Sequence, residues 1–487
     1  MSKIDRVVTR RTALLMLAAG GSAALLAACG GAASTTSAPT TGAAAAKPTA
    51  APATGAATTA PAAAAATAPA AAANPTTAPT AAPAAAAGGK NAEIHVNFRQ
   101  GSDAEWQQKF IPKFEAANPG IKVVLDVLPA EPEYWAKVQA LHATGQVGDM
   151  VWASLGNYKN FADKGLLKEL DPIISKDKYD LNDYYPAAIE TMRFNGKLFG
   201  MPWGAHTGNC AVMYNADLLD KDGLKIEDAT KDFDSLYQSA LKLTKSDGGK
   251  RSQFGFIPAG GQIGMNNIIR SFGGDFYDKD GQKLTLETPE AMNGIKWLQK
   301  MHNDASVTFG GGSNTDELFA NGKIAMVQAW WGNQFVPGDK QIAGKFKWDI
   351  VQMPKGPAGV IGTQLTINGI TMTSTSKQPD ATWAYMKYML DPVSQIEIVS
   401  NNGGRPSPRH AVMDNAELVS KLKAPKVFIP LYQTAQGWPE PANHRWPEFS
   451  SAVDQVFGPI WTGKTSLEAG MKDVTSKLQE ILSKPKA

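Results

Sequence analysis

Several tryptophans stand in loops, next to polar side chains that can form hydrogen bonds. The stretch "VQAWWGNQF" (327–335) places Trp330 and Trp331 side by side, between a short apolar run and a Gly-Asn break. An indole buries a broad, flat surface at little conformational cost, which suits the C–H face of a sugar ring. Neighbouring acids, amides and basic side chains can pair with hydroxyl groups and reject analogues that lack them. This chemistry predicts a binding site for an uncharged, hydroxyl-rich ligand.

The candidate ligand-binding residues divide into stacking platforms and polar contacts. We expect Trp330 or Trp331 to stack on the ligand together with Trp203 and Trp438, while Trp152 fits a strand core as well as a cleft. The polar candidates occupy loops or strand ends, where solvated loop residues and helix caps are the alternative interpretation: Asp103, Glu131, Glu133, Asn157, His206, Asn209, Asn368 and Arg405.

Strand and helix patterns explain how these residues could meet. The strand-like runs "EIHVNF", "IKVVLDVL" and "DMVWAS" alternate with helical stretches, which predicts an α/β fold with a parallel sheet covered on both faces. Ligands of such sheets bind outside the carboxyl ends of the strands, where "RQGSDAEW", "PAEPEYW" and "ASLGNY" lie. The pattern starts again near residue 204, and the Trp pair follows a short buried strand of this second half.

The first 90 residues predict export and tethering. Residues 1–28 have the basic, apolar and small-residue regions of a signal peptide, and "LAAC" resembles a bacterial lipobox with Cys29 as the lipidated residue. Thr9-Arg10-Arg11 also fits a twin-arginine signal, so the export route stays open. Residues 29–90 then form an Ala/Pro/Thr tether, which we expect to be disordered. We therefore expect an extracytoplasmic protein anchored to the membrane through lipid on Cys29.

Composition excludes several functions. The four basic residues and one acidic residue of the signal account for the whole net charge of +3, so the mature chain is near neutral and nucleic acid is not an expected partner. Cys210 is the one cysteine besides Cys29, and we expect it in the core. No phosphate loop, nucleophile elbow or His/Cys cluster with metal spacing occurs, so we expect no cofactor, no metal and no enzyme.

The order of six segments resembles the extracellular solute-binding proteins of bacterial ABC importers, in the class that includes maltose-binding protein. These segments are "GDMVWAS…FADKGLLKEL", "FNGKLFGMPWG" with "VMYNADLLDKDGL", "ETPEAMNGIKWLQKM", "LFANGKIAMVQAWWGN", "WDIVQMPKGPAG" and "TSTSKQPDATWAYMKYMLDPVSQIEIVSNNGGRPSPR". The resemblance implies a two-lobed type 2 periplasmic-binding-protein fold, which clamps a solute between its lobes and delivers it to permease subunits. A monomer is expected.

The resemblance also implies that the chain crosses between lobes, near 201–210, 362–368 and 412. Lobe 1 would comprise 91–205 and 366–412, and lobe 2 would comprise 206–365 and 413–487. Where many members of this family have glycine before the cleft tryptophan, this chain has Ala329. Since adjacent residues of an extended segment point to opposite sides, we expect one indole of the pair in the cleft and the other packed behind it.

Three other functions remain as alternatives. The same fold carries glycerol phosphates and polyamines, although the cleft loops have no Lys/Arg cluster suited to phosphate. Glu131 and Glu133 could be proposed as a glycosidase pair, but two acids in one loop would hardly flank opposite faces of a glycosidic bond. A carbohydrate-binding adhesin would need the same aromatic residues without any transport.

Overall fold

The computed structural model describes residues 91–131, 133–154, 156–305, 313–334, 342, 344–400, 405–435, 437 and 440–487. The predicted signal peptide, the lipidation site Cys29, the predicted tether and Trp438 lie outside these residues.

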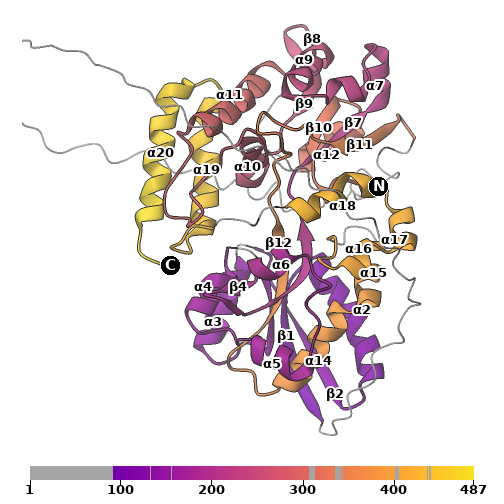
Figure 1. Ribbon diagram of the computed structural model, residues 1–487, viewed down its shortest axis with the longest axis vertical. Helices are drawn as coiled ribbons and strands as arrows, with labels where there is room; N and C mark the ends of the chain where they lie inside the picture. The colour runs from indigo at the N-terminus through magenta and orange to yellow at the C-terminus, as the bar shows by residue number, and fades with distance from the viewer. Residues whose placement is uncertain are drawn as a thin grey trace, which may run out of the picture. The chain divides into compact units, whose positions relative to one another are not determined.

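One five-stranded sheet organises the half of the described chain that we call lobe 1 (Figure 1). Its strand order is β2–β1–β3–β12–β6, with β1 (Ala92–Arg99), β2 (Ile121–Leu128), β3 (Met150–Ser154), β6 (Met201–His206) and β12 (Thr366–Met372). Strands β1, β2 and β3 are parallel, whereas β12 runs antiparallel to both β3 and β6. Strand β3 reads MVWAS and is almost entirely buried, as expected for a strand covered on both faces.

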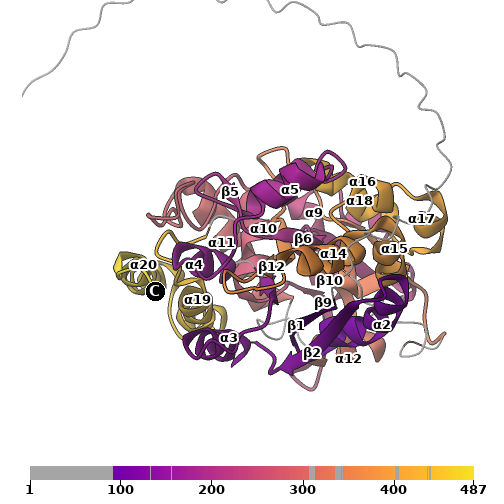
Figure 2. The same cartoon turned by 90° about the horizontal axis from the view of Figure 1, so that it is seen from below.

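Helices cover both faces of the lobe 1 sheet. Helices α2 (Ser102–Ala117) and α3 (Glu133–Ala143) make the two crossovers between the parallel strands, and Figure 2 shows them on opposite sides of the sheet. Helix α14 (Pro379–Leu390) packs beside α2. The smaller elements in this part of the fold are α4 (Tyr158–Asp163), α5 (Asp171–Asp177), α6 (Pro186–Thr191), β4 (Arg193–Phe194), β5 (Lys197–Leu198), α15 (Pro392–Ser400), α16 (His410–Met413) and α17 (Ala416–Lys421).

A second five-stranded sheet organises lobe 2. Its order is β11–β7–β10–β9–β8, with β7 (Ala211–Asn215), β8 (Lys245–Asp247), β9 (Lys250–Ile257), β10 (Ile324–Ala329) and β11 (Trp348–Gln352). Strand β10 is buried at all of its residues and ends where the Trp pair begins. The other elements here are α7 (Ala216–Lys221), α8 (Ile226–Ala229), α9 (Phe233–Leu243), α10 (Gly261–Ser271), α11 (Pro289–Asp304), α12 (Ser313–Ala320), the 3₁₀ turn η1 (Trp331–Gln334), α18 (Pro425–Thr434), α19 (Trp446–Trp461) and α20 (Leu467–Ser483).

Two connections, 207–210 and 353–365, carry the chain between the sheets, and helix α10 holds both. The Asn267 side chain donates to the Thr207 carbonyl at 3.2 Å, while Arg270 Nη1 donates to the Thr363 carbonyl at 2.6 Å. The connections also bond to each other, because the Gln364 amide donates to the Thr207 carbonyl at 3.1 Å. A Cβ on Gly362 would lie 1.9 Å from the Asn267 carbonyl oxygen, so only glycine permits this close approach to α10.

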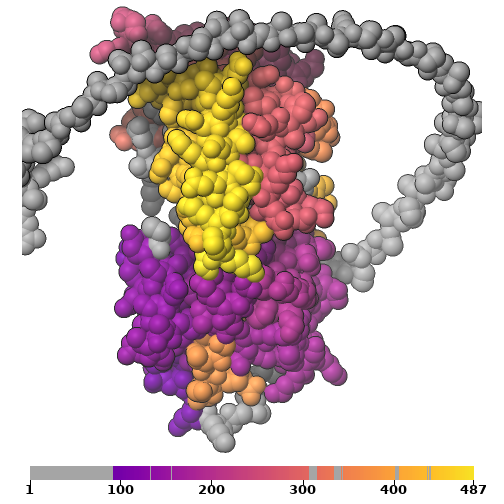
Figure 3. Space-filling model, turned by 90° about the vertical axis from the view of Figure 1, so that its left-hand side faces the viewer, coloured from indigo at the N-terminus to yellow at the C-terminus, as the bar shows by residue number. Residues whose placement is uncertain are grey.

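The C-terminal helices α19 and α20 pack against each other, and α19 also contacts α10 and α11. Figure 3 shows them in yellow beside α11, reaching the purple residues of lobe 1. The contacts at this boundary include the ion pair between Lys486 Nζ and Asp163 Oδ2, at 2.9 Å. Within the described ranges, every helix is too short or too polar to span a bilayer.

We predict that acid weakens this fold through two histidines whose pKa values are lowered in the folded chain. Burial lowers the pKa of His206 and of His302 to about 3. Between about pH 3 and pH 6.5 the unfolded chain therefore binds more protons than the native chain at these positions, and the free energy of unfolding falls as the pH falls. Denaturant titrations at pH 7.0 and 5.0 should show this loss, and His302→Phe should reduce it.

His95→Asn is the matched control, because acidic neighbours raise the pKa of His95 despite its partial burial. This variant should keep the acid-dependent loss of stability. An unfolding free energy equal at the two pH values in the unmodified chain would contradict the assignment.

Candidate functional site

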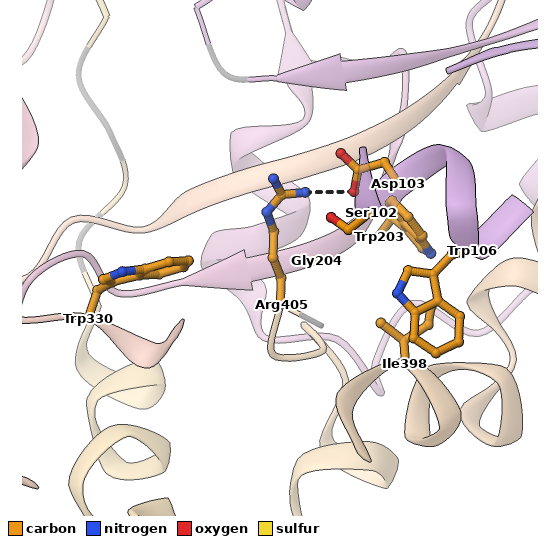
Figure 4. A pocket seen from close by; sticks show the side chains of 8 residues that line it. All are labelled: Ser102, Asp103, Trp106, Trp203, Gly204, Trp330, Ile398 and Arg405. Atoms are coloured by element: carbon orange, nitrogen blue, oxygen red, sulfur yellow. Dashed lines mark hydrogen bonds and ion pairs between the residues drawn. The ribbon is translucent and has the colours of Figure 1, made fainter. Parts of the chain in front are cut away.

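A cavity of about 550 Å³, including its open mouth, lies between the two lobes (Figure 4). We call it the Asp103 cavity. Lobe 2 contributes Trp330, and the other lining residues belong to the lobe 1 side: Ser102, Asp103, Trp106, Trp203, Gly204, Ile398 and Arg405.

The local sequence explains the position of Asp103. Strand β1 ends at Arg99, and Gly101 adopts a φ of 106°, a conformation that favours glycine and turns the chain into α2. Asp103 then lies in the first turn of α2, where the helix dipole favours a negative charge. Its side chain is consequently held at the carboxyl end of β1, where ligands of parallel sheets bind.

Asp103 is the centre of an ion-pair network. Its Oδ1 accepts a hydrogen bond from Arg405 Nη1 at 3.0 Å, and its Oδ2 accepts one from Arg99 Nε at 2.7 Å. Arg99 Nη1 also donates to Glu131 Oε2 at 3.0 Å. The backbone of Gly204 makes room for Arg405, whose Cβ would lie 3.0 Å from a Cβ at that position. Two arginines and two acids thus balance, and the network carries no net charge.

Aromatic rings form the walls of the Asp103 cavity. Figure 4 shows Arg405 between Trp330 on one side and Trp203 with Trp106 on the other. Trp203 packs edge-on against Phe98, with ring centroids 5.9 Å apart. The His206 ring lies 5.2 Å from the Trp330 ring and is neutral near pH 7, because burial, and next the Arg405 charge, lower its pKa to about 3. The walls are therefore flat, apolar and uncharged.

The two adjacent tryptophans have different environments. Trp330 is half-buried and lines the cavity, whereas Trp331 is 1% exposed and packs edge-on against Phe428 of α18. The turn after β10 sets this arrangement, since the Asn333 side chain accepts a hydrogen bond from the Trp330 backbone amide at 2.9 Å. A Cβ on Gly332 would lie 2.3 Å from the Trp330 ring, so glycine lets that indole fold across the backbone.

Other predicted residues lie around a second cavity or away from both. Glu131 and Asn157 line a cavity between α3 and α19, which we call the α19 cavity. Trp152 and Asn368 are buried in strands of the lobe 1 sheet, and Arg99 lies over the Trp152 ring at 4.0 Å. The remaining candidates line neither described cavity: Glu133 is exposed in the first turn of α3, His206 lies beside Trp330, and Asn209 lies in the connection between β6 and β7.

Three important residues were missed by the sequence analysis. Arg99 is the last residue of β1, and its position at a strand end was a signal that could have identified it. Its partners Asp103 and Glu131 lie 4 and 32 residues further along the chain, and a hydrophobic period does not reveal such pairs. Trp106 belongs to α2, where a tryptophan at helical spacing indicates core packing. Trp446 is the last residue of the loop "GWPEPANHRW" and the first of α19.

Solved structures share this fold. The GacH receptor of Streptomyces glaucescens matches with a TM-score of 0.68 and 21% identity, covering 82% of this chain and 100% of that one. An ABC substrate-binding protein of Listeria monocytogenes matches with a TM-score of 0.67 and 20% identity, covering 80% and 99%. The predicted α/β fold with two lobes is therefore confirmed.

The sequence comparisons identify the family. The family model for bacterial extracellular solute-binding proteins matches residues 109–426, so the chain belongs to that family. A protein of Brucella abortus (strain 2308), named as a binding protein, is 26% identical over 386 residues, which cover 76% of this chain and 88% of that protein. The resemblance to solute-binding proteins is therefore confirmed.

We predict that substitutions of the two adjacent indoles lower the free energy of unfolding to different extents. Trp331→Ala should lower the free energy of unfolding by about 3–5 kcal/mol, because it removes a fully buried indole from the contact with Phe428. Trp330→Ala should cost less than about 1 kcal/mol, since that ring faces a cavity. Urea titrations measure both. Equal losses for the two variants would contradict the packing described.

Proposed function

We propose that this protein is the extracytoplasmic receptor of an ABC importer and that it binds a sugar or oligosaccharide in the Asp103 cavity. The observation that carries the proposal is the combination of flat indoles with a charge-balanced polar network. Trp330 and Trp203 offer apolar faces, while Asp103 and Arg405 offer acceptor and donor atoms between them. A sugar ring has matching apolar and hydroxyl-bearing surfaces.

The charge balance favours a neutral ligand over a phosphate or a polyamine. Arg405 is paired with Asp103, and Arg99 is shared between Asp103 and Glu131. An anionic ligand would compete with these carboxylates for the guanidinium groups, and a cationic ligand would compete with the arginines. A hydroxyl group instead donates to a carboxylate and accepts from a guanidinium without breaking either ion pair.

The neighbouring structures support the same ligand class. The structures of the Streptomyces receptor include a complex with acarbose, and the Listeria protein was solved with cycloalternan. Both ligands are carbohydrates. Because sequence identity to either protein is low, these complexes support a sugar as the ligand class without selecting one sugar.

Transport follows from binding between lobes. A ligand that contacts Trp330 of lobe 2 and Asp103 of lobe 1 stabilises the arrangement in which both residues face it. Rotation about the connections 207–210 and 353–365 would bring them together, and the closed form would dock on the permease subunits. Lipid on Cys29 and the tether of residues 29–90 would keep a monomeric receptor at the membrane.

An adhesin or a glycosidase remains as a second function that the same aromatic cavity could serve. The carboxylate of Glu131 accepts hydrogen bonds from Arg99, Trp135 and Ser154, so three of its roughly four acceptor positions are engaged. Glu133 is exposed at the start of α3. A receptor should return oligosaccharides uncleaved after incubation, whereas a glycosidase would shorten them.

A thermal-shift screen of sugars, polyols and polyamines tests the ligand class. A ligand that binds only the native state raises the melting temperature, and we expect sugars to do so. Trp330→Ala should then weaken the best sugar by about tenfold or more, because it removes the lobe 2 stacking surface. Isothermal titration calorimetry measures this change.

Trp348→Ala provides the control, since Trp348 is a half-buried indole of lobe 2 that lines neither described cavity. The Trp348→Ala variant should bind the sugar with the same affinity as the unmodified chain. A melting temperature raised by polyamines and by no sugar would overturn the proposal.

A further inference from the structure

A second set of contacts joins the two lobes outside the Asp103 cavity, around helix α4 of lobe 1. Glu440 of lobe 2 is 9% exposed, and its Oε1 accepts a hydrogen bond from the Gly156 backbone amide at 2.5 Å. Its Oε2 lies 3.8 Å from Nζ of Lys159. A hydrogen bond to a carboxylate is stronger than one between neutral groups, and burial shields it from salt. We therefore expect Glu440 to make the strongest contact of this set.

An ion pair joins the lobes at the other end of α4. Oδ2 of Asp163 lies 2.9 Å from Nζ of Lys486 and 3.4 Å from Nε2 of His444. Figures 1 and 2 both show the C-terminal end of the chain beside α4. The pair of Asp163 with Lys486 is partly exposed, so by itself it contributes little. We call the contacts that Glu440 and Asp163 make across the boundary the α4 clasp.

The loop that carries Glu440 is attached closely to lobe 2. Gly281, in a turn of lobe 2, has a φ of 67°, and a Cβ there would lie 1.9 Å from the Glu440 carbonyl oxygen, so only glycine permits this approach. The Ala442 amide donates to the Gly281 carbonyl at 2.9 Å. The Asn443 side chain donates to the carbonyl of Ile481, in α20, at 2.7 Å. The Glu440 carboxylate therefore moves together with lobe 2.

Helix α4 is attached just as closely to lobe 1. The hydroxyl group of Tyr158, at the start of α4, donates to the carbonyls of Thr191 and Arg193. Gly156 has a φ of 87°, and a Cβ there would lie 2.6 Å from the Trp446 ring, so glycine lets α19 approach this side of lobe 1. Because each half of the clasp is fixed to its own lobe, rotation of the lobes about their connections breaks all of its contacts together.

We propose that the α4 clasp is a latch that holds the lobes together before any solute binds. Neither Glu440 nor Asp163 lines the Asp103 cavity, so a ligand in that cavity leaves the clasp in place. The apparent affinity of a ligand falls with the fraction of molecules in the binding arrangement, and a latch that raises this fraction strengthens binding without touching the ligand. The latch does not depend on the proposed function, and only its effect on sugar affinity rests on it.

Carbodiimide cross-linking of the ligand-free full chain tests whether the clasp is closed without a solute. The reagent couples a carboxylate to an amine where the two groups are in contact, and mass spectrometry identifies the joined peptides. Glu448 and Lys484, whose Oε1 and Nζ atoms lie 2.6 Å apart within lobe 2, provide a reference link between partly exposed groups. We expect the link between Asp163 and Lys486 to form in comparable yield. A chain that forms only the reference link would overturn the latch.

Glu440→Ala removes the buried half of the clasp and should open the lobes. Small-angle X-ray scattering of the ligand-free variant should give a larger radius of gyration than that of the unmodified chain, and the yield of the Asp163–Lys486 link should fall. The sugar with the largest thermal shift should bind about threefold or more weakly, because fewer molecules are in the binding arrangement. Glu440→Gln keeps an acceptor for the Gly156 amide and should have a smaller effect on all three measurements.

Glu448→Ala is the matched control, because it removes an acid of the same region whose partners Arg445 and Lys484 both belong to lobe 2. It should change neither the radius of gyration, nor the Asp163–Lys486 link, nor the sugar affinity. Melting temperatures of all variants show whether any change reflects unfolding.

The outcomes distinguish the latch from the proposed function. If Glu440→Ala leaves the radius of gyration and the Asp163–Lys486 link unchanged while a sugar still binds, the latch is wrong and the proposed function stands. If the screen identifies a ligand other than a carbohydrate, the proposed function is wrong, and the two ligand-free measurements still decide whether the latch exists.

Discussion

The carboxylate of Asp103, held between two guanidinium groups, is the interaction on which the cleft depends. Asp103 is 5% exposed, and a buried charge is tolerated only when it is paired. Its partners are Arg99, at the end of β1, and Arg405, which lies 302 residues after Asp103 in the chain. Removing one partner would leave an uncompensated charge, which costs more than the pair itself contributes. The requirement for pairing therefore fixes how these segments meet.

This network also determines what the cleft can hold. The charges of Arg99 and Arg405 are balanced by those of Asp103 and Glu131. These four side chains, which form the polar floor of the cleft, therefore offer hydrogen-bond donors and acceptors without net charge. The indoles above it exclude water and favour flat apolar surfaces. Since one arginine touches acids of both cavities, the floor is continuous from the Trp330 side to the Trp446 side. The charge balance of this floor is the feature from which we propose an uncharged ligand.

The sequence predicted the alternating strands and helices at the start of lobe 1 and the short strand before the Trp pair, because apolar periods of two and 3.6 residues are set locally. It also selected Asp103, Trp203, Trp330 and Arg405, which the structure brings to one cavity. It could not decide between Trp330 and Trp331, because the chain leaves β10 in a 3₁₀ turn and not as an extended strand. Helical periodicity likewise could not distinguish Trp106, which lines the Asp103 cavity, from the core tryptophans.

The most direct measurement of the central claim is the salt dependence of sugar affinity. Calorimetric titration of the sugar with the largest thermal shift should be made at about 20 mM and about 500 mM NaCl, where exposed charges are screened very differently. A neutral ligand on a charge-balanced network should bind with affinities that agree within about twofold. A loss of about tenfold or more at the higher salt concentration would show that uncompensated charge drives binding, and would contradict this account.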